Sequence, residues 1–100
     1  MEIRFRKRKL QSQYECFQNA SRAYGNEVGR KYILRINTIK QTKNIDELKR
    51  LPVLRCHPLK GDRLGQWAIN LTGFYRLIFT LEGETLEVVC IEEVSKHYDD

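Results

Sequence analysis

The sequence lacks any long apolar run. Its longest uninterrupted hydrophobic stretches, such as Leu77-Ile78-Phe79, span three or four residues, whereas a membrane-spanning helix needs roughly twenty. The N-terminal segment is charged, with neither an apolar core nor a small-residue cleavage site, so it does not have the pattern of a signal peptide. We therefore expect a cytoplasmic protein with no membrane partner.

Cysteine is scarce and has no paired spacing. Only Cys16, Cys56 and Cys90 occur, without a C-x-x-C motif, which excludes a zinc ribbon and a dithiol redox site. We expect three buried thiols in a reducing compartment. Cys56 and His57 are adjacent, so their side chains diverge in an extended segment, and no G-x-S-x-G turn offers a serine nucleophile. The sequence thus predicts neither a metal nor a cofactor.

Acidic residues are few in the first part of the chain. The 100 residues carry a net charge of +5; residues 1–60 hold 15 basic against 5 acidic side chains, and residues 61–100 hold 3 against 8. Such asymmetry indicates a polyanionic partner for one surface, although a charge run is also typical of a solvated face. The densest basic cluster is the candidate for phosphate contacts with RNA: Arg4, Arg6, Lys7, Arg8 and Lys9.

Hydrophobic periodicity predicts one strand and then helices. Period two over residues 2–6 predicts a strand with one wet face. Helical spacing predicts a helix over residues 8–24 that ends at Gly25, and a second from an N-cap at Asn26 to about Thr42. The apolar face of this second helix is formed by Val28, Tyr32, Ile36 and Ile39.

The second half of the chain changes to period two. Strands are predicted over residues 66–71, 74–81 and 85–94, with a hairpin turn at 82–84. Helices followed by strands in one short domain, 1–100, predict an α+β fold. The expected order is β-α-α-β-β-β, with two N-terminal helices packed on one face of a twisted antiparallel sheet. Residues 44–48 fit one short additional helical turn.

One loop and one strand hold several side chains suited to chemistry. His57 precedes Pro58 and is therefore expected to be extended, and Lys60 and Arg63 follow in the same turn-rich loop. Arg76 lies in a strand otherwise built of core residues. A charge at that position faces a partly wet surface or pairs with a carboxylate.

The end of the chain adds His97 and Tyr98. In an antiparallel meander the end of the last strand comes near the loop before Trp67, so we expect the two histidines to share one cleft. Metal-free RNA cleavage needs two proton transfers, which histidines can perform, and stabilisation of charge on the phosphate, which cations can supply. It also needs a base held in line, on which a ring such as Tyr98 or Trp67 can stack. Trp67 equally fits a core position, and His97 a frayed terminus.

The run Leu54–Arg63 (LRCHPLKGDR), followed by GQW at 65–67 and YRLIF at 75–79, resembles the RelE/ParE superfamily of toxins, and within it the HigB branch of plasmid-maintenance killer proteins. The resemblance extends over essentially the whole chain. It implies the toxin of a type II toxin–antitoxin module that cuts mRNA in the A site of the 70S ribosome. It also implies a cognate HigA-like helix-turn-helix antitoxin, through which alone the toxin would meet operator DNA.

Carried over by position, the resemblance implies that His57 belongs to the active site and that Arg76 stabilises charge. His97 and Tyr98 match a C-terminal cluster of aromatic and histidine residues, although some relatives place the tyrosine before the histidine. Lys60 and Arg63 fit phosphate contacts, with Asp62 as an alternative, structural partner for Arg63.

The expected reaction is metal-independent. Attack by the 2′-hydroxyl would leave a 2′,3′-cyclic phosphate and a 5′-hydroxyl, with His57 and His97 as general base and acid in either order, and with Lys60 assisting Arg76 at the phosphate. Two other functions remain open. One is a ParE-like inhibitor of DNA gyrase, which binds a protein and needs no histidine pair; the other is a non-catalytic RNA- or protein-binding module of the same fold.

Overall fold

Five strands form one sheet within residues 1–96, the part of the chain that the computed structural model describes. The strands are β1 (Glu2–Phe5), β2 (His57–Pro58), β3 (Gln66–Asn70), β4 (Tyr75–Glu82) and β5 (Val88–Lys96), in the order β1-β5-β4-β3-β2. β1 runs parallel to β5, and the other neighbours are antiparallel. The expectation of an antiparallel sheet is therefore wrong at one edge, where β1 has no hairpin partner and a long helical crossover permits parallel pairing.

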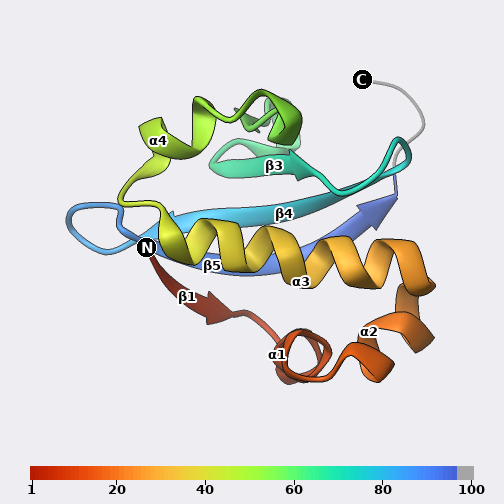
Figure 1. The fold of residues 1–100 in the computed structure, drawn as a ribbon. Helices are drawn as coiled ribbons and strands as arrows, with labels where there is room; N and C mark the ends of the chain where they lie inside the picture. Colours follow the sequence, from red (N-terminus) through yellow and green to blue (C-terminus); the bar gives the residue numbers. More distant parts are fainter. Residues whose placement is uncertain (97–100) are drawn as a thin grey trace.

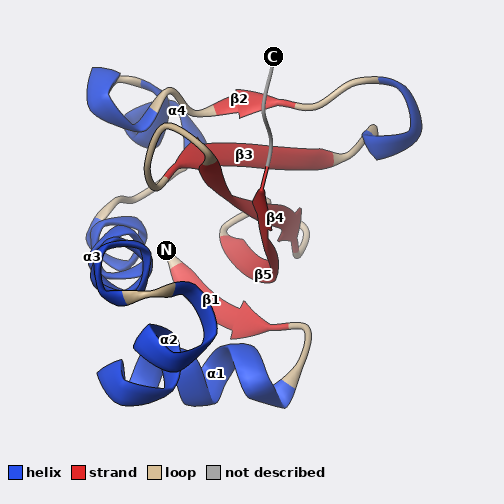
Figure 2. Cartoon of the chain, turned by 90° about the vertical axis from the view of Figure 1, so that its right-hand side faces the viewer, coloured by secondary structure: helices blue, strands red, loops and turns tan. Residues whose placement is uncertain are grey.

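The helices lie on one side of this sheet and along its β1 edge (Figure 1, Figure 2). They are α1 (Arg8–Glu15), α2 (Phe17–Tyr24), α3 (Asn26–Gln41) and α4 (Ile45–Lys49), and the 3₁₀ turns η1 (Pro52–Leu54) and η2 (Gly61–Arg63) flank β2. α3 crosses in front of the strands (Figure 1). Figure 2 shows α3 on one side of the sheet and α1 and α2 below its β1 edge, while η2 projects on the other side. None of these helices is long and apolar enough to cross a membrane.

The single helix predicted over residues 8–24 is two helices. Cys16 is extended (φ −138°, ψ 110°) and separates α1 from α2. Asn19 donates through its side-chain amide to Ser12 Oγ at 2.7 Å, whereas residues seven apart in a straight helix are separated by about 10 Å along the axis. The bend therefore lets both Leu10 and Ala20 be buried in the core, which the periodicity of the sequence did not distinguish from one straight helix.

The junction between α2 and α3 depends on Gly25. Its φ of +88° ends α2, as the sequence predicts, and Gly25 rather than Asn26 is the N-cap of α3. The Asn26 side chain instead hydrogen-bonds Ser21. Four residues into α3, a Cβ on Gly29 would come within 3.0 Å of the α2 backbone, so the two helices pack as closely as their main chains allow.

The core lies between the helices and the sheet. The predicted apolar face of α3 is buried there, and it packs against the inward side chains of β3, β4 and β5. The residues that fill this core include Leu10, Tyr32, Ile36, Ile39, Leu48, Leu54, Ile69, Leu77, Phe79, Val89 and Ile91. A second, smaller cluster of Leu59, Ala68 and Ile78 lies on the opposite face of the sheet.

The strand predictions are close in the centre of the sheet and less accurate at its ends. β3 and β4 match the predicted ranges to within one residue at each end. β5 begins at Val88 rather than at residue 85, because Leu86 has a positive φ of 54°, which a strand does not contain. β2 was not predicted; it is only two residues long and contains Pro58, which is compatible with an edge strand.

Candidate active site

His57 and Arg76 lie on the same face of the sheet, opposite α3. His57 pairs with Ala68, Ala68 pairs with Ile78, and Arg76 is two residues before Ile78 on β4. Positions paired across neighbouring strands share a face, so two strand spacings and two residues separate the Cα atoms of His57 and Arg76 by about 12 Å. Arg76 is not among the residues that line the pocket around His57, so the structure places the two side chains on one face without bringing them into one pocket.

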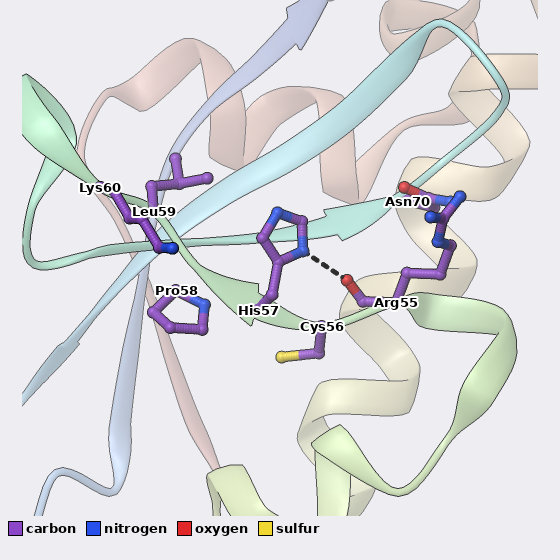
Figure 3. A pocket seen from close by; sticks show the side chains of 7 residues that line it. All are labelled: Arg55, Cys56, His57, Pro58, Leu59, Lys60 and Asn70. Atoms are coloured by element: carbon purple, nitrogen blue, oxygen red, sulfur yellow. Dashed lines mark hydrogen bonds between the residues drawn. The ribbon is translucent and has the colours of Figure 1, made fainter. Parts of the chain in front are cut away.

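His57 lies in an open pocket of about 630 Å³. We call it the His57 pocket; its lining residues are Arg55, Cys56, His57, Pro58, Leu59, Lys60 and Asn70. Figure 3 shows Arg55 and Asn70 on one side of the imidazole ring and Lys60 on the other. Among the residues that the structure describes, the lining contains two cationic side chains and no carboxylate. Such a pocket favours an anionic group beside the imidazole.

The backbone fixes the tautomer of His57. Its Nδ1 lies 2.7 Å from the carbonyl oxygen of Arg55 (Figure 3). A carbonyl only accepts hydrogen bonds, so Nδ1 must carry the proton. In the neutral ring Nε2 is then the unprotonated nitrogen, and it can take a proton from a substrate or, once protonated, donate one.

The acceptor that holds His57 comes from a strained residue. Arg55 caps η1 in the left-handed region (φ 49°, ψ 45°), and its amide donates to Pro52 O at 3.2 Å. Left-handed backbone is uncommon for residues other than glycine and costs roughly 1–2 kcal/mol. The turn directs the Arg55 carbonyl back toward the imidazole two residues later. Sequence reasoning missed Arg55, since no residue pattern reports a left-handed arginine.

Cys56 is poorly suited to act as a nucleophile in this pocket. Burial raises the pKa of its thiol to about 11, with the Lys49 ammonium opposing part of that effect. The thiol therefore stays protonated at neutral pH and is a poor nucleophile or metal ligand. Among residues 1–96 no group of three or more His, Cys, Asp or Glu side chains is arranged to hold a metal ion.

Trp67 and Arg63, both predicted to contact RNA, have structural partners within the chain. Trp67 pairs with Pro58, whereas its neighbour Ala68 pairs with His57, so Trp67 lies on the α3 side of the sheet. Its ring is stacked on that of Phe79, with centroids 6.5 Å apart. Arg63 forms an ion pair with Glu93 at 3.3 Å, not with Asp62. Neither side chain is brought beside the imidazole.

The N-terminal basic cluster lies at the far edge of the sheet. β1 and β2 are separated by four strand spacings, which is roughly 19 Å. Arg4 is paired with Glu82 at 3.2 Å, and Arg6 is paired with Glu82 at 3.1 Å and Glu92 at 2.9 Å. The exposed residues Lys7, Arg8 and Lys9 remain available for a polyanion, but at a distance from the His57 pocket.

A bulge in β5 explains how two consecutive acidic residues reach the same face. Ile78 pairs with Glu93 and Phe79 with Ile91, so Glu92 is the extra residue. Glu92 accepts hydrogen bonds from Thr80 Oγ1 at 2.7 Å and from Arg6, while Glu93 receives Arg63. The hydrogen bond from Arg6 is the main cause that lowers the pKa of Glu92.

The predicted residues His97 and Tyr98 lie outside the described residues.

No protein-family model and no curated protein matches this sequence. Solved structures do. A YoeB/ParE toxin from Agrobacterium tumefaciens superposes with a TM-score of 0.58 at 22% identity, covering 98% of this chain and 100% of that one. YafQ from E. coli gives 0.61 at 15%, covering 95% and 91%. The YoeB-YefM complex from Staphylococcus aureus gives 0.54 at 19%, covering 98% of both chains.

The chain has the RelE-like toxin fold. The superposition extends over nearly all of the chain, so the RelE/ParE resemblance predicted from residues 54–79 is confirmed at the level of the fold. In this RelE-like fold the His57 pocket occupies the β2 edge of the sheet face that α3 leaves uncovered. The assignment to the HigB branch stays a prediction.

Proposed function

We propose that this protein is the toxin of a type II toxin–antitoxin module and that it cleaves mRNA without a metal ion. The observation that carries the proposal is the His57 imidazole, fixed through Nδ1 by a backbone carbonyl in a basic pocket. A fixed imidazole with cations beside it is suited to proton transfer at a phosphodiester. The RelE-like fold supports this proposal because a solved structure that shares it, that of the YoeB/ParE protein from Agrobacterium tumefaciens, is a toxin.

In the proposed reaction the substrate's 2′-hydroxyl attacks the adjacent phosphorus. Its proton passes to a general base, the P–O5′ bond breaks, and a general acid protonates the leaving 5′-oxygen. The products are a 2′,3′-cyclic phosphate and a 5′-hydroxyl. We assign Nε2 of His57 to one proton transfer and His97 or Tyr98 to the other. Arg76 and Lys60 stabilise the negative charge that develops on the phosphate oxygens.

The proposed partners follow from the RelE-like fold. The YoeB of Staphylococcus aureus was solved as a complex with YefM, and we propose that this chain likewise has a cognate antitoxin, of the HigA-like helix-turn-helix type, through which it meets operator DNA. We further propose that it acts in the cytoplasm as one domain on mRNA in the 70S ribosome. Lys7, Arg8 and Lys9, which follow β1 at the edge of the sheet opposite β2, would contact ribosomal RNA.

The test is cleavage by single variants during induced expression. We expect His57→Ala and Arg76→Ala each to reduce mRNA cleavage and growth arrest by about 10²–10⁴-fold. His57→Gln keeps a polar side chain but cannot titrate, and should be equally inactive. The matched control is Arg30→Ala, which removes an exposed arginine of α3 outside the His57 pocket. Its cleavage pattern, from mapping of mRNA 5′ ends, should equal that of the wild type.

The same experiment separates the alternative functions. Discrete 5′ ends within reading frames that disappear in His57→Ala support the nuclease. Growth arrest with intact mRNA and an induced DNA-damage response would instead identify a gyrase inhibitor. Wild-type activity in both His57→Ala and Arg76→Ala contradicts the assignment of the site. Neutralisation by the product of the adjacent gene tests the antitoxin.

A further inference from the structure

A second pocket adjoins the His57 pocket at the end of the sheet. It has a volume of about 350 Å³ and lies between α3, η1 and the loop that joins β3 to β4. We call it the Arg35 pocket; its lining residues are Glu27, Lys31, Arg35, Val53, Asn70, Leu71, Thr72 and Gly73. Asn70 lines both pockets. The two pockets therefore lie on either side of one residue, Asn70.

The central feature of this second pocket is a buried arginine. Arg35 is only 8% exposed, and its Nε donates to the carbonyl oxygen of Asn70 at 3.2 Å. No carboxylate of residues 1–96 forms an ion pair with it. A buried charge without a counter-ion is costly unless another group compensates it. A buried arginine that serves only the core would be expected to have an acidic partner.

The terminal nitrogens of Arg35 are directed at the pocket. Its Nη groups have no protein acceptor among the described residues, yet they are absent from the buried polar atoms that lack a partner. They must therefore be reached by solvent, and the Arg35 pocket is the opening that the guanidinium lines. The arrangement leaves two planar donors available for a bidentate contact with an anion.

Two further donors border the same space. Lys31 is one turn before Arg35 on the same ridge of α3, as expected for residues four apart. The backbone amide of Gly73 makes no hydrogen bond to another backbone group in residues 1–96. Glu27, one turn before Lys31, is the single acidic side chain of the lining among the described residues. The pocket therefore offers two cations and an amide donor against one carboxylate. This excess of positive charge favours the binding of an anion of low charge.

We propose that the Arg35 pocket binds a second phosphate of the RNA strand whose scissile phosphate lies in the His57 pocket. The inference rests on the proposed nuclease function and adds to it a second contact, along the strand. Arg35 and Lys31 would hold the phosphate oxygens, while Arg55 and Asn70 border the path between the two pockets. A substrate longer than a dinucleotide would therefore bind more tightly, because a dinucleotide does not reach the Arg35 pocket.

The test uses 2′-O-methyl oligoribonucleotides, which cannot undergo attack by the 2′-hydroxyl. In amide NMR spectra of the wild type, we expect a dinucleotide to shift the signals of His57 and Lys60. A tetranucleotide should additionally shift Thr72 and Gly73. Lys31→Ala should lower affinity for the tetranucleotide by about tenfold and reduce the salt slope by about 0.7, with dinucleotide affinity unchanged. Arg30→Ala, which removes the same charge elsewhere on α3, should bind both as the wild type does.

Arg35 itself is probed by two substitutions, because its burial makes misfolding a risk. Arg35→Lys keeps the charge and Arg35→Met keeps the apolar stem; in folded samples both should lose the advantage of the tetranucleotide over the dinucleotide. If the Lys31→Ala and Arg35→Lys proteins retain that advantage, the proposal is overturned while the nuclease site stands. If neither oligonucleotide shifts the His57 signals of the wild type, both the second contact and the proposed function are rejected.

Discussion

Arg55 offers a substitution that should separate stability from activity. Its side chain is exposed and lines the His57 pocket, while its backbone is left-handed. Glycine at this position removes a strain of about 1–2 kcal/mol and adds a cost of about 0.5–1 kcal/mol for unfolded-chain entropy. We therefore expect Arg55→Gly to raise the free energy of unfolding by about 0.5–1 kcal/mol, or about 2–8 °C in Tm for a chain of this size.

The activity of the same variant should fall. Arg55→Gly keeps the backbone carbonyl that fixes His57 but removes a cation from the pocket. Loss of one charge-assisted hydrogen bond to a phosphate costs about 1.5–3 kcal/mol, which corresponds to about tenfold or more in kcat/KM. The assays are urea denaturation followed by circular dichroism and cleavage of a ribosome-bound message by the purified protein.

Arg55→Ala is the matched control, because it removes the same cation and leaves the left-handed strain. Its activity should equal that of Arg55→Gly, and its stability should stay near that of the wild type. The reasoning about strain is refuted if Arg55→Gly unfolds at lower urea concentration than Arg55→Ala. The reasoning about the pocket is refuted if both variants cleave as fast as the wild type.

Three further outcomes are expected. Gly29→Ala places a Cβ within 3.0 Å of the α2 backbone and should destabilise the fold by about 1–3 kcal/mol; an unchanged or higher urea midpoint would contradict the close packing. Tyr32→Phe removes a buried hydroxyl that donates to Leu10 O at 2.7 Å and should lose about 1–2 kcal/mol, checked in the same way; no loss would mean that this bond contributes nothing net. The pKa of Glu92 is lowered, chiefly by its hydrogen bond from Arg6, so its stabilising contribution is complete above the unfolded-state pKa and is lost as the pH falls through the folded-state value. The urea midpoints of wild type and Glu92→Gln should therefore converge as the pH falls from about 6, above the ordinary pKa of a glutamate, through the folded-state value, and a constant difference would contradict the assignment.

The sequence was sufficient for those parts of the fold that repeat a local pattern. The apolar face of α3, the stop at Gly25 and the central strands β3 and β4 follow from spacing alone. The break at Cys16 does not, because residues 8–24 keep helical spacing across it. Only contact with α3, through Leu10 and Ala20, decides between one helix and two.

The candidate site was predicted in part, for a related reason. His57 and Lys60 are near in sequence, and the structure places both in one pocket. Arg55 and Asn70 depend on a left-handed turn and on strand pairing, which a single sequence does not report. The sequence left Trp67 open between a ring that stacks on a base and a core position. The pairing of His57 with Ala68 in the unpredicted strand β2 shows that Trp67 is on the face opposite His57.

In the folded chain the uneven charge of the sequence is distributed unequally over the sheet. Acidic residues of β4 and β5 pair with basic residues that cross the uncovered face: Glu82 and Glu92 with Arg4 and Arg6, and Glu93 with Arg63. This pairing neutralises positive charge near the β1 edge and at η2.

Three basic residues around the two pockets have no ion pair among the described residues. Arg55 and Lys60 in the His57 pocket, and Arg35 in the pocket beside it, form no ion pair within residues 1–96. A polyanion approaching the uncovered face is therefore attracted more strongly to the β2 edge than to β1, apart from the exposed Lys7, Arg8 and Lys9. The acidic half of the chain thus contributes to the site indirectly, because it leaves the positive potential concentrated where the imidazole lies.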